Sequence, residues 1–394
     1  HELEGAYLAQ RIANGTKTKA EEPLLRLLIA NDGDSAEHWQ QVTAALADEV
    51  SGPQRLVAVV GTGQTLTGRQ EAIEALTVDH GIPVIASQLT GDHLTPPTTQ
   101  APVQGLVRLA PSSSDQVAAA VAFLKREPSI ARALLVQSTD PGDGYSKSLG
   151  DAFLTAFPDA THTVLTPAEK YNPQLGGVAN TMKGMLANIC QQRPDVIFFA
   201  GHGQELVEFV NALPERPCDL RINIITADSA VNFTTTVTQD HDELRRGMET
   251  NVVVRYTALA HPESWKAFAG SFKPGLSELF QSPCEEVCFD IFFRGESLDD
   301  GSAIIGYDAI TTATTAIRPG GTPNDTPDLI TQEFNRLHGS RAVAGASGWI
   351  SLDNGNPINK AVPILEVRPD GTVMFVQLSS SRRSPCHPGD PDLC

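Results

Sequence analysis

The sequence predicts an α/β protein in which parallel sheets are covered by helices on both faces. Short apolar runs alternate with amphipathic segments from Leu24 to Thr226. This alternation is typical of parallel strands joined by crossover helices. The series holds more strand–helix units than one ordinary sheet uses, and 394 residues exceed one typical domain. We therefore expect two domains or one large α/β unit.

The regular series occupies the first part of the chain. Apolar runs predict strands, and apolar residues at three- and four-residue spacing predict helices. The predicted strands are Leu24–Ala30, Arg55–Val60, Pro83–Ala86, Leu106–Leu109, Arg132–Gln137, Val196–Ala200 and Ile222–Thr226. The predicted helices are Ala36–Val50, Arg69–Asp79, Ser114–Lys125, Ser146–Phe157, Val178–Cys190 and Glu205–Leu213.

After Val231 the alternation of predicted strands and helices becomes less regular. Asn251–Tyr256 reads as a strand, and the polar Pro-Ser-Ser-Ser run at 111–114 suits a crossover between two sheets. The polar, proline-rich tail from Ser379 is expected to be mobile. Two further helices are predicted at Pro262–Phe280 and Ile304–Ile317, and a β segment at Val343–Val376 with hairpin turns at Asn354-Gly355 and Asp370-Gly371.

The charge balance excludes several classes of protein. The chain has 29 basic and 47 acidic residues, a net charge of −18. Nucleic acids and anionic membranes both attract basic surfaces, so neither is an expected partner. No apolar stretch is long enough to span a membrane. Because the sequence starts at His1 rather than Met, we expect a signal peptide or anchor to have been removed upstream.

The six cysteines favour disulfides over free thiols, because none forms a zinc-type CxxC set. Cys284 and Cys288 lie four positions apart. Cys386 and Cys394 are placed to close a small loop in the tail.

The glycine-rich turn Gly61–Gly68 follows a predicted strand and precedes a predicted helix. It is not a P-loop, since no Lys follows the last glycine, and its glycine spacing is not that of a dinucleotide-binding turn. Free backbone N–H groups and hydroxyls at a helix N-terminus suit a carboxylate or another small anion. The alternative is a plain turn whose glycines only permit the backbone path.

Polar residues follow other predicted strands in the same way. Ser87-Gln88-Leu89-Thr90, Gly201-His202-Gly203 and Ala227-Asp228-Ser229 each come directly after one. Strand ends of a parallel sheet gather at one edge, where ligands bind. Asp228 could receive a ligand ammonium there, or could cap the turn that follows.

The sequence does not predict an enzyme. His202 and Glu205 lie three apart, but no second histidine completes a catalytic zinc site. Gly345-Ala346-Ser347-Gly348 comes nearest to a nucleophile elbow, with Trp349 in place of the closing glycine. Hydroxyls and few titratable groups at the strand ends suit binding better than acid–base chemistry. We therefore predict no catalytic residues, no metal and no cofactor.

Short motifs follow one another in a specific order from about Gly5 to Val376. Together they resemble the type I periplasmic binding proteins, in particular the leucine/isoleucine/valine-binding proteins of branched-chain amino-acid ABC transporters. The motifs are Gly5-Ala6 with Ala9 and Ile12-Ala13-Asn14, Asn31-Asp32, Ala44-Ala45-Leu46, Val60-Gly61 with Thr65, Ile82-Pro83-Val84-Ile85 with Ser87, Tyr307-Asp308-Ala309, and Asp353-Asn354-Gly355 with Gly371.

The resemblance implies a ligand site whose first half holds a carboxylate. Gln64 and Thr65 would bind it through backbone N–H and hydroxyl groups. Leu89 and Thr90, following Ser87, would complete this half.

The resemblance places the second half of the site in the other lobe. Tyr145 lies near the family's aromatic residue, in a motif shifted from the family's order. His202 stands where an aromatic often covers the ligand, and Asp228 where an acidic residue pairs with the ligand's α-ammonium. Closure of the lobes would desolvate the ligand and strengthen both contacts.

The implied topology is two Rossmann-like lobes joined by three hinge crossovers, near Pro111, Tyr256–Ala258 and Gly345–Ser351. Lobe 1 would comprise residues 1–111 and 257–345, lobe 2 residues 112–256 and 346–378, and the tail residues 379–394. In lobe 2, Cys190 and Cys218 each precede a strand and could form a disulfide.

Two departures from the family pattern affect the expectations. The family's first strand has no counterpart, since His1 begins inside the first helix, and we expect that strand to lie upstream. The loop at Thr65 lacks the family's double serine, and His202 replaces an aromatic. The second departure points to a ligand other than a branched-chain amino acid.

The resulting prediction is a solute-binding protein located outside the cytoplasm, in the periplasm or at the cell surface, with a lipid anchor as one option. It would bind an amino acid or related zwitterion and deliver it to the permease of an ABC importer. A membrane sensor ectodomain with the same lobes is the alternative, and an enzyme is a weaker one. A DNA-binding repressor fits poorly with the net charge of −18.

Overall fold

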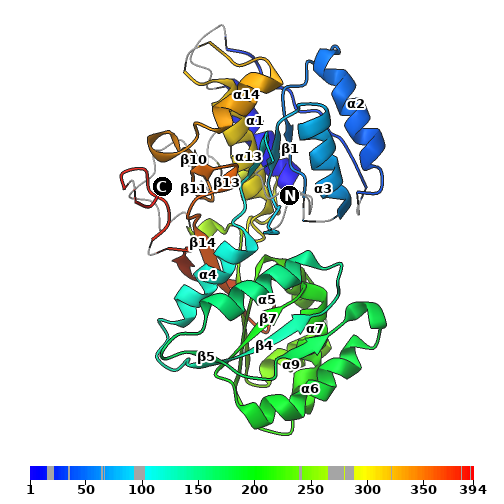
Figure 1. The fold of residues 1–394 in the computed structure, drawn as a ribbon, viewed down its shortest axis with the longest axis vertical. Helices are drawn as coiled ribbons and strands as arrows, with labels where there is room; N and C mark the ends of the chain where they lie inside the picture. Colours follow the sequence, from blue (N-terminus) through cyan, green and yellow to red (C-terminus); the bar gives the residue numbers. More distant parts are fainter. Residues whose placement is uncertain are drawn as a thin grey trace. The chain divides into compact units, whose positions relative to one another are not determined.

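The computed structural model of the protein (Figure 1) describes residues 1–15, 22–33, 36–63, 65, 67–92, 103–238, 242–264, 279, 288–320, 322–382, 384–390 and 392–394. Gln64, Cys284 and most of the helix predicted at Pro262–Phe280 lie outside these residues. Among the described helices, none combines the length and hydrophobicity that a membrane span requires.

The chain divides into two compact units. Unit 1 comprises His1–Ser112, Leu259–Ala361 and Ser384–Cys394, and unit 2 comprises Ser113–Ala258 and Val362–Arg383. The first two boundaries lie close to the crossovers expected near Pro111 and Tyr256–Ala258. The third lies after Ala361 rather than near Gly345–Ser351, and a fourth returns the tail to unit 1.

Unit 2 contains an eight-stranded sheet in the order β15-β14-β9-β8-β7-β4-β5, with β6 also paired to β4. The strands from β4 to β9 run parallel, whereas β14 is antiparallel to both β9 and β15. The strands are β4 (Arg132–Ser138), β5 (Thr163–Val164), β6 (Glu169–Tyr171), β7 (Val196–Ala200), β8 (Ile222–Thr226), β9 (Val252–Thr257), β14 (Val362–Val367) and β15 (Val373–Ser379).

Both faces of this sheet are covered by helices, as the sequence predicted. The helices are α4 (Ser113–Leu124), α5 (Gly144–Ala156), α6 (Val178–Gln192), α7 (Gly203–Ala212), α8 (Val231–Thr238) and α9 (Asp242–Glu249), with short 3₁₀ turns η2 (Pro173–Leu175), η3 (Leu213–Glu215) and η4 (Asp228–Ala230). Side chains of α6, α7 and α9 pack on one face of the sheet, and those of α4 and α5 pack on the other.

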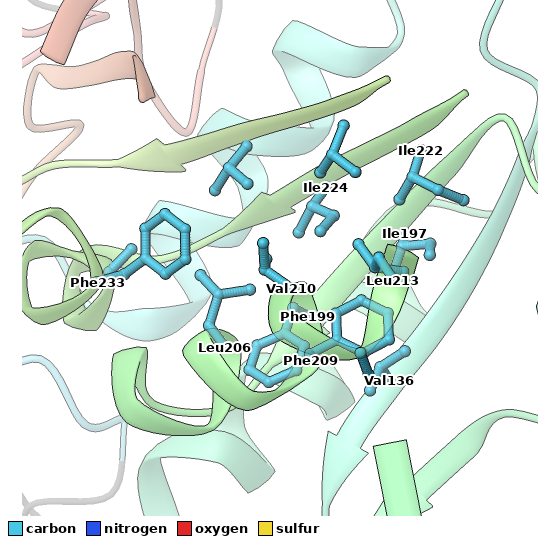
Figure 2. Close-up of a cluster of buried hydrophobic side chains, with 14 of the residues drawn as sticks. Val136, Ile197, Phe199, Leu206, Phe209, Val210, Leu213, Ile222, Ile224 and Phe233 are labelled. Carbon is cyan, nitrogen blue, oxygen red and sulfur yellow. The ribbon is translucent and has the colours of Figure 1, made fainter. Parts of the chain in front are cut away.

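The alternation of side chains along β7 shows how one apolar run serves both faces. Ile197 and Phe199 join the core beneath α7, and Figure 2 shows them beside Phe209 and Val210. The intervening Phe198 joins the core beneath α5 instead. Successive side chains of a strand point to opposite faces, so a strand buried on both sides must be apolar throughout.

Unit 1 contains a smaller parallel sheet of β1 (Val59–Val60), β2 (Val84–Ala86) and β3 (Leu106–Arg108). Its described helices are α1 (Glu2–Gly15), α2 (Trp39–Ser51), α3 (Thr67–Glu74) continued by the π-helical η1 (Ala75–Asp79), α12 (Phe289–Phe292), α13 (Ser302–Ile317), α14 (Pro327–Phe334) and the 3₁₀ turn η6 (Gly339–Arg341).

Glycines allow α1 and α13 to approach each other closely. A Cβ at Gly5 would lie 1.7 Å from the carbonyl oxygen of Ala303, and one at Gly306 would lie 2.1 Å from that of Glu2. Any larger residue at either position would force the two backbones apart. The buried face of α13 then carries Tyr307 and Asp308 into the interior of unit 1.

The strand predicted at Leu24–Ala30 is wrong, because this segment pairs with no described strand. Its backbone is held at one point by side chains of α1. Asn14 Nδ2 and Gln10 Nε2 donate to the carbonyl oxygen of Leu25, at 2.9 and 2.8 Å, and Leu25 N donates to Asn14 Oδ1 at 2.8 Å. An apolar pattern cannot form a ladder unless a second backbone edge lies beside it.

The β segment predicted at Val343–Val376 is shared between the two units. In unit 1 it forms the hairpins β10 (Val343–Gly345) with β11 (Gly348–Ile350) and β12 (Leu352–Asp353) with β13 (Asn356–Pro357). Val343, Ile350 and Leu352 pack in a core cluster with residues of α13 and α14, which explains the later boundary. Both predicted hairpin turns are present, with Gly355 at φ 75° and Gly371 at φ 83°.

The tail differs from the mobile segment that its composition predicted. Ser379 belongs to β15, and the residues from Ser384 onward contact unit 1. Cys386 N donates to the carbonyl oxygen of Asn359 at 2.9 Å, and Ser351 Oγ donates to that of Cys394 at 3.0 Å. The amide side chain of Asn359, whose residue is 3% exposed, supplies these otherwise irregular residues with fixed hydrogen-bond partners.

Two disulfides are defined among the described residues. Cys190 pairs with Cys218 in unit 2 at a Cα–Cα distance of 5.9 Å, and Cys386 pairs with Cys394 in the tail at 4.8 Å. Cys288 is also disulfide-bonded. All three observations agree with the expectation of disulfides over free thiols.

Candidate functional site

The described candidates fall into two groups, one in each unit. In unit 1, Thr65 follows β1 and the Ser87–Thr90 loop follows β2. In unit 2, Tyr145, His202 and Asp228 lie at the starts of α5, α7 and η4. The structure brings the three residues of unit 2 into one hydrogen-bonded cluster.

In unit 1, Thr65 links the ends of two neighbouring strands. Its Oγ1 accepts hydrogen bonds from Thr90 N at 3.2 Å and from Gly91 N at 3.0 Å. These bonds occupy the acceptor capacity of the hydroxyl, so its hydrogen is the part left to bind a ligand oxygen. Thr65 and Thr90, which were predicted to belong to the same half of the site, are therefore hydrogen-bonded to each other.

Ser87 and Leu89 are less suited to touch a ligand through their side chains. Both are 0% exposed. Leu89 packs in an apolar cluster with Ile73 and Leu76. Gln88 Nε2 donates to Glu2 Oε2 at 3.2 Å, so this loop is directed toward α1. Burial raises the pKa of the Glu2 carboxyl, and its contact with Ser87 partly offsets this effect.

Arg108 supports this loop and was not a sequence candidate. It is 5% exposed, its Nη1 donates to the carbonyl oxygen of Gly91 at 2.7 Å, and its Nε donates to Asn356 Oδ1 at 2.8 Å. A buried arginine at the end of an apolar strand was the available signal, because such a charge needs partners.

Unit 1 also contains a mainly apolar cavity of about 620 Å³ lined by α1, residues 26–30 and β1. Among its lining residues are Leu3, Leu28 and Val60. Gly61 and Thr62 border it, but neither Thr65 nor any residue of the Ser87–Thr90 loop does. The cavity is therefore separate from the predicted carboxylate half-site.

In unit 2, Asp228 is the centre of the polar cluster. Its Oδ1 accepts hydrogen bonds from Gln116 Nε2 at 2.9 Å and from Tyr145 OH at 3.0 Å. Its Oδ2 accepts none from another described residue. One carboxylate oxygen is thus fixed by the protein, and the other retains its capacity to accept.

The loop after β8 is held in place by the residues beside Asp228. Tyr145 OH accepts a hydrogen bond from Ser229 N at 3.2 Å, while Ser229 Oγ accepts one from Gly203 N at 3.2 Å. A Cβ at Gly203 would lie 2.5 Å from the carbonyl oxygen of Ser229. Glycine at this position therefore lets α7 begin directly against the Asp228 loop.

His202 stacks on Tyr145, with ring centroids 5.0 Å apart and an angle of 25° between the rings. Its Nδ1 lies 3.3 Å from Ser229 Oγ, and its Nε2 lies 3.3 Å from Asp143 Oδ1. Asp143 also caps α5, because its Oδ1 accepts from Ser146 N at 2.9 Å. These contacts hold the imidazole ring in one orientation at the side of the cluster.

Burial and charge act against each other in this cluster. Burial raises the pKa of Asp228, while Gln116 and Tyr145 stabilise its ionised form and limit the rise. Burial also raises the pKa of Tyr145 well above its ordinary value, and the Asp228 charge adds to this. Tyr145 therefore remains a protonated hydrogen-bond donor.

His202 and Asp143 favour each other's charged form. Burial opposes the imidazolium, but the Asp143 hydrogen bond and charge, with Glu205 and Asp228, raise the pKa of His202 overall. For Asp143, burial is likewise outweighed by His202 and Ser146, and its pKa is lowered. A protonated His202 would leave the cluster with an excess of carboxylates, a setting that attracts a cationic group.

The sequence predicted Asp228, Tyr145 and His202 as site residues, and the structure connects Asp228 to Gln116 and Thr257, which the sequence did not predict. Thr257 Oγ1 donates to Gln116 Oε1 at 2.8 Å, and both residues are 0% exposed. Gln116 lies among the apolar, buried positions of α4. A polar residue at such a position is the signal that could have identified it.

No family model matches the chain, and no curated relative does. Solved structures match over nearly the whole length. A leucine-binding protein from Thermotoga maritima MSB8 is 18% identical, with a TM-score of 0.65, over 95% of this chain and 93% of that one. An ABC transporter substrate-binding protein from Desulfitobacterium hafniense, in complex with Leu, is 17% identical with a TM-score of 0.68 and 95% coverage of both chains.

A third structure widens the range of ligands associated with the fold. The solute-binding protein of an ABC transporter from Rhodopseudomonas palustris BisB5, in complex with 3,4-dihydroxy benzoic acid, is 15% identical with a TM-score of 0.60. It covers 98% of this chain and 94% of its own. At these identities the similarity establishes the fold, so the protein has the two-lobed α/β fold of type I periplasmic binding proteins.

Proposed function

We propose that the protein is an extracytoplasmic solute-binding protein of an ABC importer, and that its ligand carries an ammonium group recognised by Asp228. The observation that carries the proposal is the one-sided hydrogen bonding of this carboxylate. Oδ1 receives two donors, whereas Oδ2 receives none from another described residue. Partly buried carboxylates with an unused oxygen attract a cationic donor.

The ligand class follows from the chemistry of Asp228 in unit 2, which retains an oxygen for an ammonium. An amino acid or a related zwitterion carries this group. Within unit 1, Thr65 separately retains a hydroxyl hydrogen that suits a carboxylate. A benzoic acid, which one structural neighbour binds, carries only the carboxylate.

Location outside the cytoplasm is supported by the disulfides. Cys190–Cys218 and Cys386–Cys394 both have ordinary Cα–Cα separations, and such bonds persist in oxidising compartments. Delivery to a permease is supported by structural neighbours that are substrate-binding or solute-binding proteins of ABC transporters.

The test is calorimetric titration with L-leucine, with the deaminated acid that has the same side chain, and with a wider amino-acid panel. We expect the wild-type protein to bind at least one amino acid and to reject its deaminated partner. Asp228→Asn keeps the shape of the side chain and should weaken this binding by about 2–5 kcal/mol, as for a desolvated charge pair.

Glu208→Gln is the matched control, because it removes one negative charge from an exposed position of α7. Its affinity should equal that of the wild type. Equal binding of an amino acid and its deaminated analogue, with no loss in Asp228→Asn, would refute recognition of an ammonium by Asp228. Thermal shift provides a rapid screen, since a ligand at 100 times its Kd adds about 2.7 kcal/mol of stability.

A further inference from the structure

We propose that Gln116 is a positioning residue for Asp228, and that Thr257 supports its amide in the orientation this requires. The proposal rests on the ligand-binding role assigned to Asp228. Gln116 is 0% exposed, so it acts through Asp228 and not by touching a ligand. The three residues come from the start of α4, the end of β9 and the loop after β8.

The hydrogen bonds determine which way the Gln116 amide points. Its Oε1 accepts from Thr257 Oγ1 at 2.8 Å and from Asp228 N at 3.2 Å. The Asp228 N–H can only donate, so the amide atom that faces it must be the oxygen, and the Thr257 hydroxyl, which can donate or accept, then donates to the same atom. The Nε2 group must then face Asp228 Oδ1, which it reaches at 2.9 Å.

The opposite amide orientation would be costly in this environment. It would set the NH₂ group against the Asp228 N–H and would set a carbonyl oxygen against the carboxylate. Thr257 is itself 0% exposed, so no water-facing alternative is open to its hydroxyl. A buried polar network of this kind either satisfies all its members or loses stability.

Fixing Oδ1 has a direct effect on the other oxygen. Gln116 and Tyr145 approach Oδ1 from α4 and α5, and together they prevent the carboxylate from rotating. Oδ2 is then held in one direction before any ligand arrives. A carboxylate oriented in advance loses less conformational freedom on binding, which increases affinity.

The proposal predicts a property of the ligand-free protein. Removing the Gln116 hydrogen bond leaves the buried Asp228 carboxylate with a single donor from a side chain, Tyr145. The ionised form then becomes less stable, and the carboxyl titrates at higher pH. This property can be measured without knowing the natural ligand.

The experiment follows the carboxyl carbon of Asp228 by NMR in the ligand-free protein, with the signal assigned from its loss in Asp228→Asn. We compare the wild type with Gln116→Leu and Thr257→Val. The midpoint should rise in Gln116→Leu and rise by a smaller amount in Thr257→Val, which removes only the hydroxyl. Unchanged midpoints in both variants would overturn the proposal, even if their melting temperatures fall.

A binding measurement gives the second readout, with L-leucine as the probe. Gln116→Leu should bind about tenfold more weakly, as expected for loss of one hydrogen bond to a charged group. In an Asp228→Asn background the same change should have no further effect, because the charge being positioned is gone. An equal tenfold loss in both backgrounds would indicate a general packing role and would contradict the proposal.

The two readouts separate this proposal from the proposed function. If the wild type binds neither L-leucine nor any other amino acid, ammonium recognition fails, while the titration still decides whether Gln116 positions Asp228. If amino acids bind but the midpoints do not move, the function stands and the positioning role fails. Thr257→Val is close to isosteric, so it remains informative if Gln116→Leu folds poorly.

Discussion

Asp308 in unit 1 and Asp228 in unit 2 are both carboxylates whose pKa burial raises, but their hydrogen-bonding capacity is satisfied to different degrees. Asp308 Oδ1 accepts from Ala346 N at 2.5 Å, and its Oδ2 accepts from Ser347 N at 2.9 Å and also from Ser347 Oγ. The Lys360 ammonium lies near enough to stabilise its charge. Asp228, in contrast, has donors from other residues on one oxygen only.

We interpret the difference as that between a structural carboxylate and the carboxylate proposed to bind a ligand. Asp308 is 0% exposed and connects α13 to the turn between β10 and β11. Each of its two carboxylate oxygens accepts at least one hydrogen bond within unit 1. Asp228 has donors on Oδ1, whereas its Oδ2 accepts none from another described residue. A carboxylate oxygen without such a donor, more than burial or charge, distinguishes the two proposed roles.

The largest change in unfolding free energy is expected for substitution of Asp308. Asp308→Ala removes three hydrogen bonds and leaves Lys360, 1% exposed, without its nearby negative charge. We expect a loss of about 3–5 kcal/mol of unfolding free energy, as for a broken buried pair. Urea denaturation measures it.

Asp328→Ala, an exposed acidic residue of the same unit, is the matched control and should change stability by less than about 1 kcal/mol. Burial lowers the pKa of Lys360 to about 8. The double variant Asp308→Ala/Lys360→Met should therefore regain part of the loss, because no unpaired ammonium then remains. Similar stabilities for Asp308→Ala and its control would contradict the structural role of Asp308.

A smaller effect is expected at the pair formed by His202 and Asp143. Because the pKa of His202 is raised on folding, the pair adds stability below the unfolded value of 6.5 and loses it as pH rises through the folded value. The imidazole is 44% exposed, so the contribution should be under about 1 kcal/mol.

His202→Gln should abolish this pH dependence, and melting curves recorded across the titration of the imidazole would show it. A wild-type slope that persists in His202→Gln would place the titrating group elsewhere.

The smallest effect on stability is expected at Asp228 itself. Burial raises the pKa of Asp228, so its folded form binds a proton more readily than its unfolded form. This contribution to stability is present at low pH and is lost as pH rises through the folded pKa. At neutral pH, Asp228→Asn should therefore be neutral or slightly stabilising.

Denaturation of wild type and Asp228→Asn at neutral and mildly acidic pH measures this contribution. The two curves should converge as the pH falls toward full protonation of the carboxyl. A loss of several kcal/mol in Asp228→Asn at neutral pH would make Asp228 a structural residue like Asp308, and the distinction between the two would disappear.

The fold could be predicted from the sequence because its signals are local. Val196–Ala200 is apolar throughout and Ile222–Thr226 is rich in isoleucine, and the structure makes them β7 and β8 with the same bounds. Leu24–Ala30 shows a similar pattern and is no strand, because pairing depends on a partner edge that the segment itself does not encode. The later unit boundary at Ala361 was missed for a related reason, since it depends on where the hairpins pack.

The candidate site was predictable only in part. Asp228, Tyr145 and His202 follow strands or begin helices, where position alone suggests a role. Gln116 and Thr257 are separated from each other by 141 positions in sequence, and nothing local connects them. Side chains that meet only in the folded protein cannot be recognised as a network from any short stretch of sequence.

Two side chains donate to the same oxygen of Asp228, and this limits which substitutions of Asp228 the protein can tolerate. Two donors, Gln116 Nε2 and Tyr145 OH, converge on Oδ1. Replacement by an apolar residue would leave both without an acceptor, whereas Asn retains one carbonyl oxygen for them and loses only the negative charge. Under the proposed role of Asp228, libraries built to accept ligands that lack an amine should therefore begin from Asp228→Asn.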